Sequence, residues 1–151
     1  MRNSGNDMLE LIAFTLGDQE FCIEVMSVRE IRSWTPATIL PHSPGHVRGV
    51  INLRGVVLPV MDLAERLGLA PAEPSEASVI IVTQIGNQII GLLVDLVSDI
   101  FTVSAEDVHA APDVSKTMDR DQIRGMIPME ERMICFLQLD ALFGTIESEA
   151  A

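Results

Sequence analysis

The sequence predicts an all-β fold, made of two small five-stranded barrels that share one hydrophobic core and carry short helical turns. Short apolar runs alternate with turn signals along most of the 151 residues, as is typical of an all-β chain. The two halves of the chain repeat one pattern, and each half is too small to bury a sufficient core alone. Closing five strands into a barrel removes the exposed strand edges.

The internal repeat is found by sliding the chain along itself. A shift of 69 places Gly17–Ile31 on Gly86–Ile100, with five identities in fifteen positions. A shift of 76 places Arg48–Gly68 on Arg124–Gly144, again with five identities. Composition alone gives about one identity in such a window. The repeat therefore predicts about five strands in each half.

The chain is expected to begin with a β-hairpin. Strands are predicted at Met8–Leu16 and Gln19–Ile23, joined by the two-residue turn signal Gly17-Asp18. Within Val25–Ile31, valine and isoleucine recur every three residues, which allows one helical turn before an extended stretch at Arg29–Trp34.

A second hairpin follows the proline-rich loop Pro36–Gly45. The apolar runs Val47–Ile51 and Val56–Met61 flank the polar tip Asn52-Leu53-Arg54-Gly55, a pattern that predicts two strands and a turn. Because the chain has few basic residues, Arg54 at this tip is a candidate contact residue.

The segment after this hairpin ends the first half. Pro59 lacks an amide donor, so we expect it at a sheet edge or a bulge. Asp62–Gly68 is predicted to form one or two helical turns, with Asp62 as the N-cap and Gly68 at the C-terminal stop. The polar, proline-containing stretch Ala70–Glu76 is expected to link the two halves.

The second half is predicted to follow the same plan. Its expected elements are strands at Ser78–Ile85, Gln88–Val94, Val97–Val103, Gln122–Ile127 and Met133–Leu139, a serine-capped turn at Ser104–Asp107, a loop at Ala110–Asp121 and a short helix at Asp140–Gly144.

These elements predict a single domain over residues 8–144. Its first subdomain is expected at 17–68 and its second at 77–144, with the N-terminal strand 8–16 packing at their junction. Residues 1–7 and 145–151 are expected to be flexible tails.

The net charge of −12, from 22 acidic and 10 basic residues, restricts the possible partners. Nucleic-acid binding needs a basic face, and anionic membranes repel an acidic surface for the same reason. No signal-peptide pattern opens the chain, and its longest near-continuous apolar run, Ile89–Val94, is far shorter than the ~18 residues of a membrane span. We therefore expect a cytoplasmic protein that binds no nucleic acid and does not insert into a membrane.

No catalytic or cofactor-binding pattern stands out. His42 and His46 have the spacing of helical metal ligands, but the prolines around them exclude a helix and no third ligand lies nearby. Phosphate-binding glycine loops and the nucleophile elbow are absent from the sequence. Cys22 and Cys135 each lie in an apolar run, which favours two buried free thiols. The residues thus indicate a binding module without metal or cofactor, not an enzyme.

Several motifs form a recognisable set: Phe14–Asp18, Val28–Arg32, Gly49–Leu63, Gly91–Asp95 with Val97–Asp99, and Arg132–Ile134 with Leu139-Asp140. Together they closely resemble the CheW family of chemotaxis coupling proteins, over roughly residues 8–144. The Asn-Leu-Arg-Gly tip in its apolar frame is a specific signal of this family. The resemblance implies two five-stranded SH3-like barrels packed on a common core, in agreement with the repeat.

The resemblance also implies a scaffold that bridges the cytoplasmic hairpin tip of chemoreceptors and the regulatory domain of the histidine kinase CheA. It places the receptor-facing surface at Glu30, Arg54, Asn52, Leu53, Gly49 and Val28, and the kinase-docking surface at Val25, Val28 and Ile12. A further, weaker contact of the second barrel is expected to close rings of kinase and coupling domains.

Other interpretations of the same residues stay open at this point. Glu30 and Arg54 have opposite charges and, on adjacent strands, would form a simple cross-strand ion pair. The chain is also compatible with a piece of a larger kinase or of a fusion with a receiver domain. Its initial Met and the lack of receiver or ATP-binding sequence favour a separate coupling protein. A small-molecule-binding barrel or enzyme would need a pocket with convergent polar groups, which the sequence does not indicate.

Overall fold

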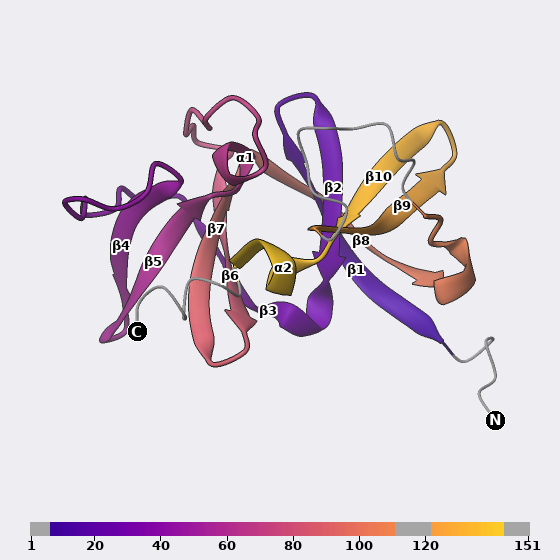
Figure 1. Ribbon diagram of the computed structural model, residues 1–151, viewed down its shortest axis with the longest axis horizontal. Coiled ribbons are helices and arrows are strands. Elements are labelled where there is room, and N and C mark those ends of the chain that lie inside the picture. Colours follow the sequence, from indigo (N-terminus) through magenta and orange to yellow (C-terminus); the bar gives the residue numbers. More distant parts are fainter. Residues whose placement is uncertain (1–6, 111–121, 144–151) are drawn as a thin grey trace.

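The computed structural model describes residues 7–110 and 122–143. In this part of the chain, ten strands form two five-stranded sheets, accompanied by four short helical segments (Figure 1). The strands are β1 (Met8–Leu16), β2 (Gln19–Glu24), β3 (Val28–Ser33), β4 (Val47–Leu53), β5 (Val56–Asp62), β6 (Val79–Ile85), β7 (Gln88–Val94), β8 (Leu96–Ser104), β9 (Ile123–Met129) and β10 (Arg132–Leu137). The helical segments are η2 (Val25–Ser27), α1 (Leu63–Arg66), η3 (Ala105–Asp107) and α2 (Leu139–Phe143). The predicted all-β class is confirmed.

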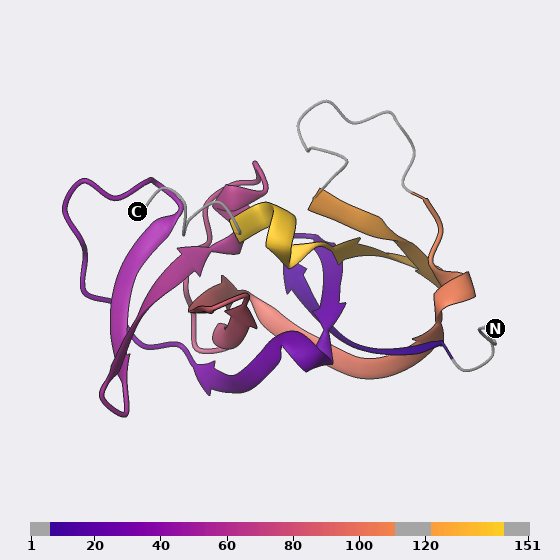
Figure 2. The same ribbon diagram turned by 60° about the horizontal axis from the view of Figure 1, so that its bottom comes forward.

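The two sheets exchange strands between the halves of the chain. Sheet A has the order β8-β1-β2-β10-β9, and sheet B has the order β3-β6-β7-β5-β4. The predicted subdomain boundaries, 17–68 and 77–144, therefore do not match the sheets: β2 pairs in sheet A, whereas β6 and β7 pair in sheet B. The chain crosses to the other sheet at η2 and again after β7 (Figure 2). Each crossing places two consecutive strands, β2 and β3 or β7 and β8, in different sheets.

The strand registers follow the internal repeat. The parallel pair β5–β7 aligns Val60 with Gly91, and the parallel pair β10–β2 aligns the equivalent residues Phe136 and Cys22. The β4–β5 ladder shifts register around Arg48, and the β10–β9 ladder shifts around the equivalent Arg124. Each sheet thus combines two strands of one half with three strands of the other half.

A shared core joins the two sheets. On β1, Ile12 and Phe14 point into it, whereas Leu11 and Ala13 pack inside sheet A, so the middle of this strand is buried on both faces. Both α1 and α2 add side chains to the shared core, and α2 lies between the sheets (Figure 1). The buried members of this core are Ile12, Phe14, Leu16, Phe21, Ile23, Met61, Leu63, Ala64, Leu67, Ile81, Ile85, Ile90, Leu92, Val94, Cys135, Leu137, Leu139, Leu142 and Phe143.

Local predictions are borne out at two helical segments. The Asp62 carboxylate accepts a hydrogen bond from the Glu65 amide at 3.2 Å and so caps α1, as predicted. The helical turn expected within Val25–Ile31 is η2.

The predicted edge position of Pro59 is wrong, because β5 lies between β4 and β7. Its missing amide is tolerated there because the β5–β7 ladder begins only at Val60.

Four sequence predictions fall partly or wholly on residues outside the described ranges. They are the tail 145–151, residues 1–6 of the N-terminal tail, the part of the Ala110–Asp121 loop beyond Ala110, and the end of the predicted helix at Gly144.

Candidate docking groove

The tip of the β4–β5 hairpin is a tight two-residue turn. Arg54 and Gly55 have φ angles of 52° and 87°, so both adopt the left-handed conformation that a type I′ turn requires. The Asn52 side chain accepts a hydrogen bond from the Gly55 amide at 2.8 Å, which stabilises the turn. A non-glycine residue costs about 1–2 kcal/mol in this conformation. The fold therefore holds an arginine at a position where glycine or asparagine is easier to accommodate.

Arg54 reaches a carboxylate on the far edge of the same sheet. Its Nη2 donates to Oε1 of Glu30 at 2.6 Å, and Oε2 of Glu30 accepts from Arg32 at 3.2 Å. The alternative of a pair on adjacent strands is wrong, since β3 and β4 are the two edge strands of sheet B. The curl of the sheet brings these edges together (Figure 2). The hydrogen bond between Arg54 and Glu30 bridges them.

The ion pair affects both partners electrostatically. The hydrogen bond from Arg54, followed by that from Arg32, lowers the pKa of Glu30, and the bond to Glu30 raises the pKa of Arg54. The Arg54 side chain is 69% exposed, so water screens the pair and its contribution to stability is small. The contact therefore orients the arginine more than it stabilises the fold.

An open groove of about 350 Å³ lies beside this pair. Its floor is apolar and its rim is charged. The lining residues are Arg29, Glu30, Leu53, Arg54, Val56, Leu58, Val82 and Ile89, which come from both edges and the centre of sheet B.

The rim of the groove is basic in an otherwise acidic chain. Arg29, Arg32 and Arg54 are three of the ten basic residues, and all lie on or beside the groove around the single carboxylate of Glu30. Sequence reasoning missed Arg29 and Arg32. Their positions before and after Glu30 in the same strand, β3, could have indicated them as site residues.

The other residues that the resemblance places on the receptor-facing surface shape the hairpin. Leu53 is 8% exposed and belongs to the core of sheet B. Gly49 is buried with φ at +145°, and a Cβ there would lie 2.2 Å from the carbonyl oxygen of Thr38. Val28 is half-buried against the shared core at the start of β3. The structure thus brings Glu30 and Arg54 into contact, with Asn52, Leu53 and Gly49 in the hairpin that carries the arginine.

The residues expected at the kinase contact lie around η2. Val25 and Val28 are half-buried and pack against the shared core. Ile12 is only 1% exposed within that core and is inaccessible to a partner, so we exclude it from the docking surface. Met26, which sequence reasoning missed, is 92% exposed between the two valines. The three-residue spacing of Val25 and Val28 could have indicated it. On a helical turn, this spacing places both valines on the core side and Met26 on the outer side.

Within the described residues, the structure contains no group of three or more His, Cys, Asp or Glu side chains arranged to hold a metal ion. Cys22 and Cys135 are buried free thiols, and burial raises their pKa values to about 12 and about 11. Among these residues there is also no helix with the length and apolar character needed to span a membrane.

Comparisons with known proteins agree on one family. The family model of the CheW-like domain matches residues 10–147. The probable chemotaxis protein CheW of Rhizobium etli is 57% identical over 142 residues, which cover 94% of this chain and 92% of that protein. The chemotaxis protein CheW of Klebsiella aerogenes is 33% identical over 91% of this chain and 83% of its own length. The crystal structure of the scaffolding protein TtCheW from Thermoanaerobacter tengcongensis superposes with a TM-score of 0.83, at 30% identity, covering 89% of this chain and 87% of that one.

Proposed function

The chain belongs to the CheW-like family of chemotaxis proteins, and we propose from this that it couples the cytoplasmic tips of chemoreceptors to the CheA histidine kinase. It is a chemotaxis adaptor and not an enzyme, in keeping with the solved relative, which is described as a scaffolding protein.

The observation that carries the proposal is the Glu30–Arg54 pair at the rim of an apolar groove. A receptor hairpin tip that places apolar side chains in the groove also meets an arginine whose position Glu30 fixes. Such a charged rim around an apolar centre favours a specific orientation of the partner. Asn52, Leu53 and Gly49 support the site by holding the hairpin that presents Arg54.

For the kinase regulatory domain we propose the surface around η2. Met26 supplies an exposed apolar side chain, and Val25 and Val28 form a partly exposed base beside it. An exposed apolar residue surrounded by packed neighbours is the kind of anchor that dominates protein interfaces. Val28 lies only two residues from Glu30, so this surface adjoins the receptor groove along β3.

The proposed place of action is the cytoplasm, at receptor arrays near the membrane. The net charge of −12 supports this proposal because it disfavours direct contact with anionic lipid or nucleic acid. Array association would then depend on receptor and kinase contacts alone.

Calorimetric titration tests the proposal. The protein is titrated with a purified receptor cytoplasmic fragment, with the kinase regulatory domain, and with both partners in sequence. We expect one site for each partner and a ternary complex when both are present. Failure of the folded protein to bind the receptor fragment would overturn the receptor assignment, and mutual exclusion of the two partners would overturn the coupling role.

A further inference from the structure

Sheet A contains the equivalent of every position that lines the docking groove of sheet B. The repeat gives the correspondence between the two sheets. The shift is 69 for residues before β4 and β9, and 76 within the β4–β5 and β9–β10 hairpins. The shared strand registers confirm that the positions correspond. We call the mapped set the counterpart positions. They are Ala13 for Val82, Glu20 for Ile89, Ser98 for Arg29, Asp99 for Glu30, Met129 for Leu53, Glu130 for Arg54, Arg132 for Val56, and Ile134 for Leu58.

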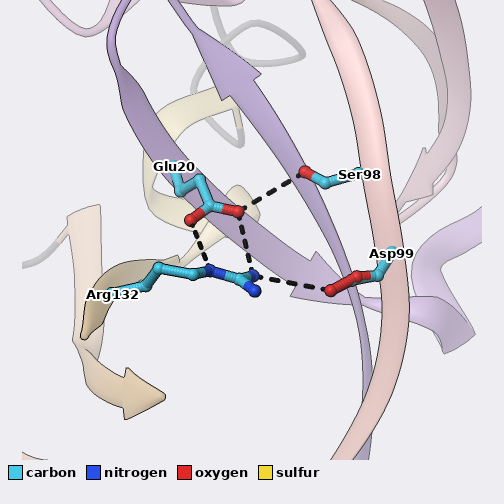
Figure 3. Close-up of polar contacts among 4 residues, drawn as sticks. All are labelled: Glu20, Ser98, Asp99 and Arg132. Atoms are coloured by element: carbon cyan, nitrogen blue, oxygen red, sulfur yellow. Dashed lines mark hydrogen bonds and ion pairs between the residues drawn. The ribbon is translucent and has the colours of Figure 1, made fainter. Parts of the chain in front are cut away.

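A polar cluster occupies the counterpart positions (Figure 3). Arg132 lies on β10 and donates to both carboxylate oxygens of Glu20 on the neighbouring β2, at 2.9 and 3.0 Å. The same guanidinium reaches Asp99 on the edge strand β8 at 3.5 Å. Ser98 donates to Glu20 at 3.5 Å. The side chains of Arg132 and Glu20 therefore lie over β10 and β2 of sheet A. The equivalent strands of sheet B, β5 and β7, carry apolar side chains of the groove floor at these positions.

Both sheets use an arginine to reach the same edge position, but from different places in the hairpin. In sheet B, Arg54 at the turn reaches Glu30, which leaves Val56 free to line the groove. In sheet A the arginine is two positions further along the chain, at the place of Val56. The turn position of sheet A is Glu130, whose φ of 56° is close to the 52° of Arg54. The first residues of the two turns thus share a left-handed conformation and differ in charge.

We propose that Glu20, Glu130 and Arg132 restrict receptor docking to sheet B. Glu20 and Arg132 fill the counterpart groove with a paired polar cluster, and Glu130 replaces the arginine that a receptor tip would meet. This inference rests on the proposed function, because it explains why two similar sheets give one docking site. Apart from these three positions, the lining keeps its character at Asp99, Met129 and Ile134.

An exchange of these three residues tests the proposal. The exchange variant carries Glu20→Ile, Glu130→Arg and Arg132→Val, which introduces the sheet B residues at these three positions. It is combined with Arg54→Glu, which removes docking at sheet B. Titration with a receptor cytoplasmic fragment is expected to show no binding for Arg54→Glu alone. With the three exchanges added, we expect one site with an affinity within about a factor of ten of the original.

A matched control retains Glu130. The variant with Arg54→Glu, Glu20→Ile and Arg132→Val is expected not to bind, because its new groove lacks the arginine. No binding by the folded full exchange variant would overturn the proposal. Equal binding by the control would also overturn it, since Glu130 would then not be a determinant.

The reverse exchange covers the case in which the full variant fails to fold. Val56→Arg with Ile89→Glu places the arginine–glutamate pair in the groove of sheet B, where it is expected to weaken receptor binding at least tenfold. Unchanged affinity would overturn the proposal, because a filled groove would then not prevent docking. If the original protein itself fails to bind, the proposed function fails instead, so the two failures are distinguishable.

Discussion

Arg54 and Glu30 are joined by a 2.6 Å hydrogen-bonded ion pair, although they come from opposite edges of a five-stranded sheet. The strands between these edges, β6, β7 and β5, curl enough for the two side chains to meet. Because the pair is exposed, its consequence is geometric: it fixes an arginine at the rim of an apolar groove.

Charge reversal at this arginine is expected to remove receptor binding without unfolding the protein. Arg54→Glu places like charges beside Glu30 and leaves the groove without its basic tip. We expect no detectable binding of the receptor fragment, while stability changes by less than ~1 kcal/mol. Calorimetric titration and chemical denaturation measure the two effects. Arg124→Glu is the matched control, because it breaks an exposed ion pair with Glu24 in the other sheet; equal losses in both variants would contradict the groove assignment.

The ionisation of Glu30 reports the contact directly. Its lowered pKa means that the folded state favours the carboxylate over the protonated acid. The contribution of the pair to folding stability is therefore fully present above pH 4.5, the ordinary pKa of a glutamate. This contribution is lost as the pH falls through the lower pKa of the folded state. Carboxyl NMR titration is expected to show this lowered pKa. Arg54→Ala should raise it more than Arg32→Ala does, because the Arg54 hydrogen bond is the larger cause. An unchanged Glu30 titration in Arg54→Ala would show that the pair does not form in solution.

Substitutions at η2 test the kinase-docking surface. Met26→Glu adds a charge at a 92% exposed side chain, so it is expected to weaken binding of the kinase regulatory domain with little change in stability. Val28→Glu should weaken binding too, but it also costs about 1–3 kcal/mol of stability because Val28 is half-buried. A pull-down or titration with the kinase domain measures binding. Ile39→Glu, at a 78% exposed side chain outside η2, serves as the control, and a loss there equal to that of Met26→Glu would place docking elsewhere.

Gly49 is expected to act through the backbone and not through partner contact. Its φ of +145° and the 2.2 Å approach of an added Cβ to the Thr38 carbonyl predict that Gly49→Ala destabilises the protein by about 2 kcal/mol or more. Gly17→Ala is the control, because that site has a φ of +62° but open space around it, and about 1 kcal/mol is expected there. Urea denaturation measures both variants. Equal stability of the original protein and Gly49→Ala would show that the close approach does not constrain this strand.

Local features of this protein followed from the sequence because they depend on neighbouring residues. The apolar runs around Asn52–Gly55 gave the hairpin, and the polar Asp62 ahead of an apolar helix gave its cap. The repeat indicated a duplicated plan, since equivalent positions in both halves must satisfy the same ladder register. Arg54 could be singled out because a charged turn residue stands apart from its apolar flanks.

Only the tertiary structure decided which strands share a sheet and which residues are accessible. The resemblance placed Ile12 on the kinase-docking surface, but the folded chain covers both faces of β1 around this residue and buries it. Glu30 and Arg54 meet because sheet B curls, and the exchange of β2 with β6 and β7 depends on parallel pairing with distant strands. These contacts join residues far apart in the chain, and the free energy that selects them comes from burying the shared core, which no local pattern contains.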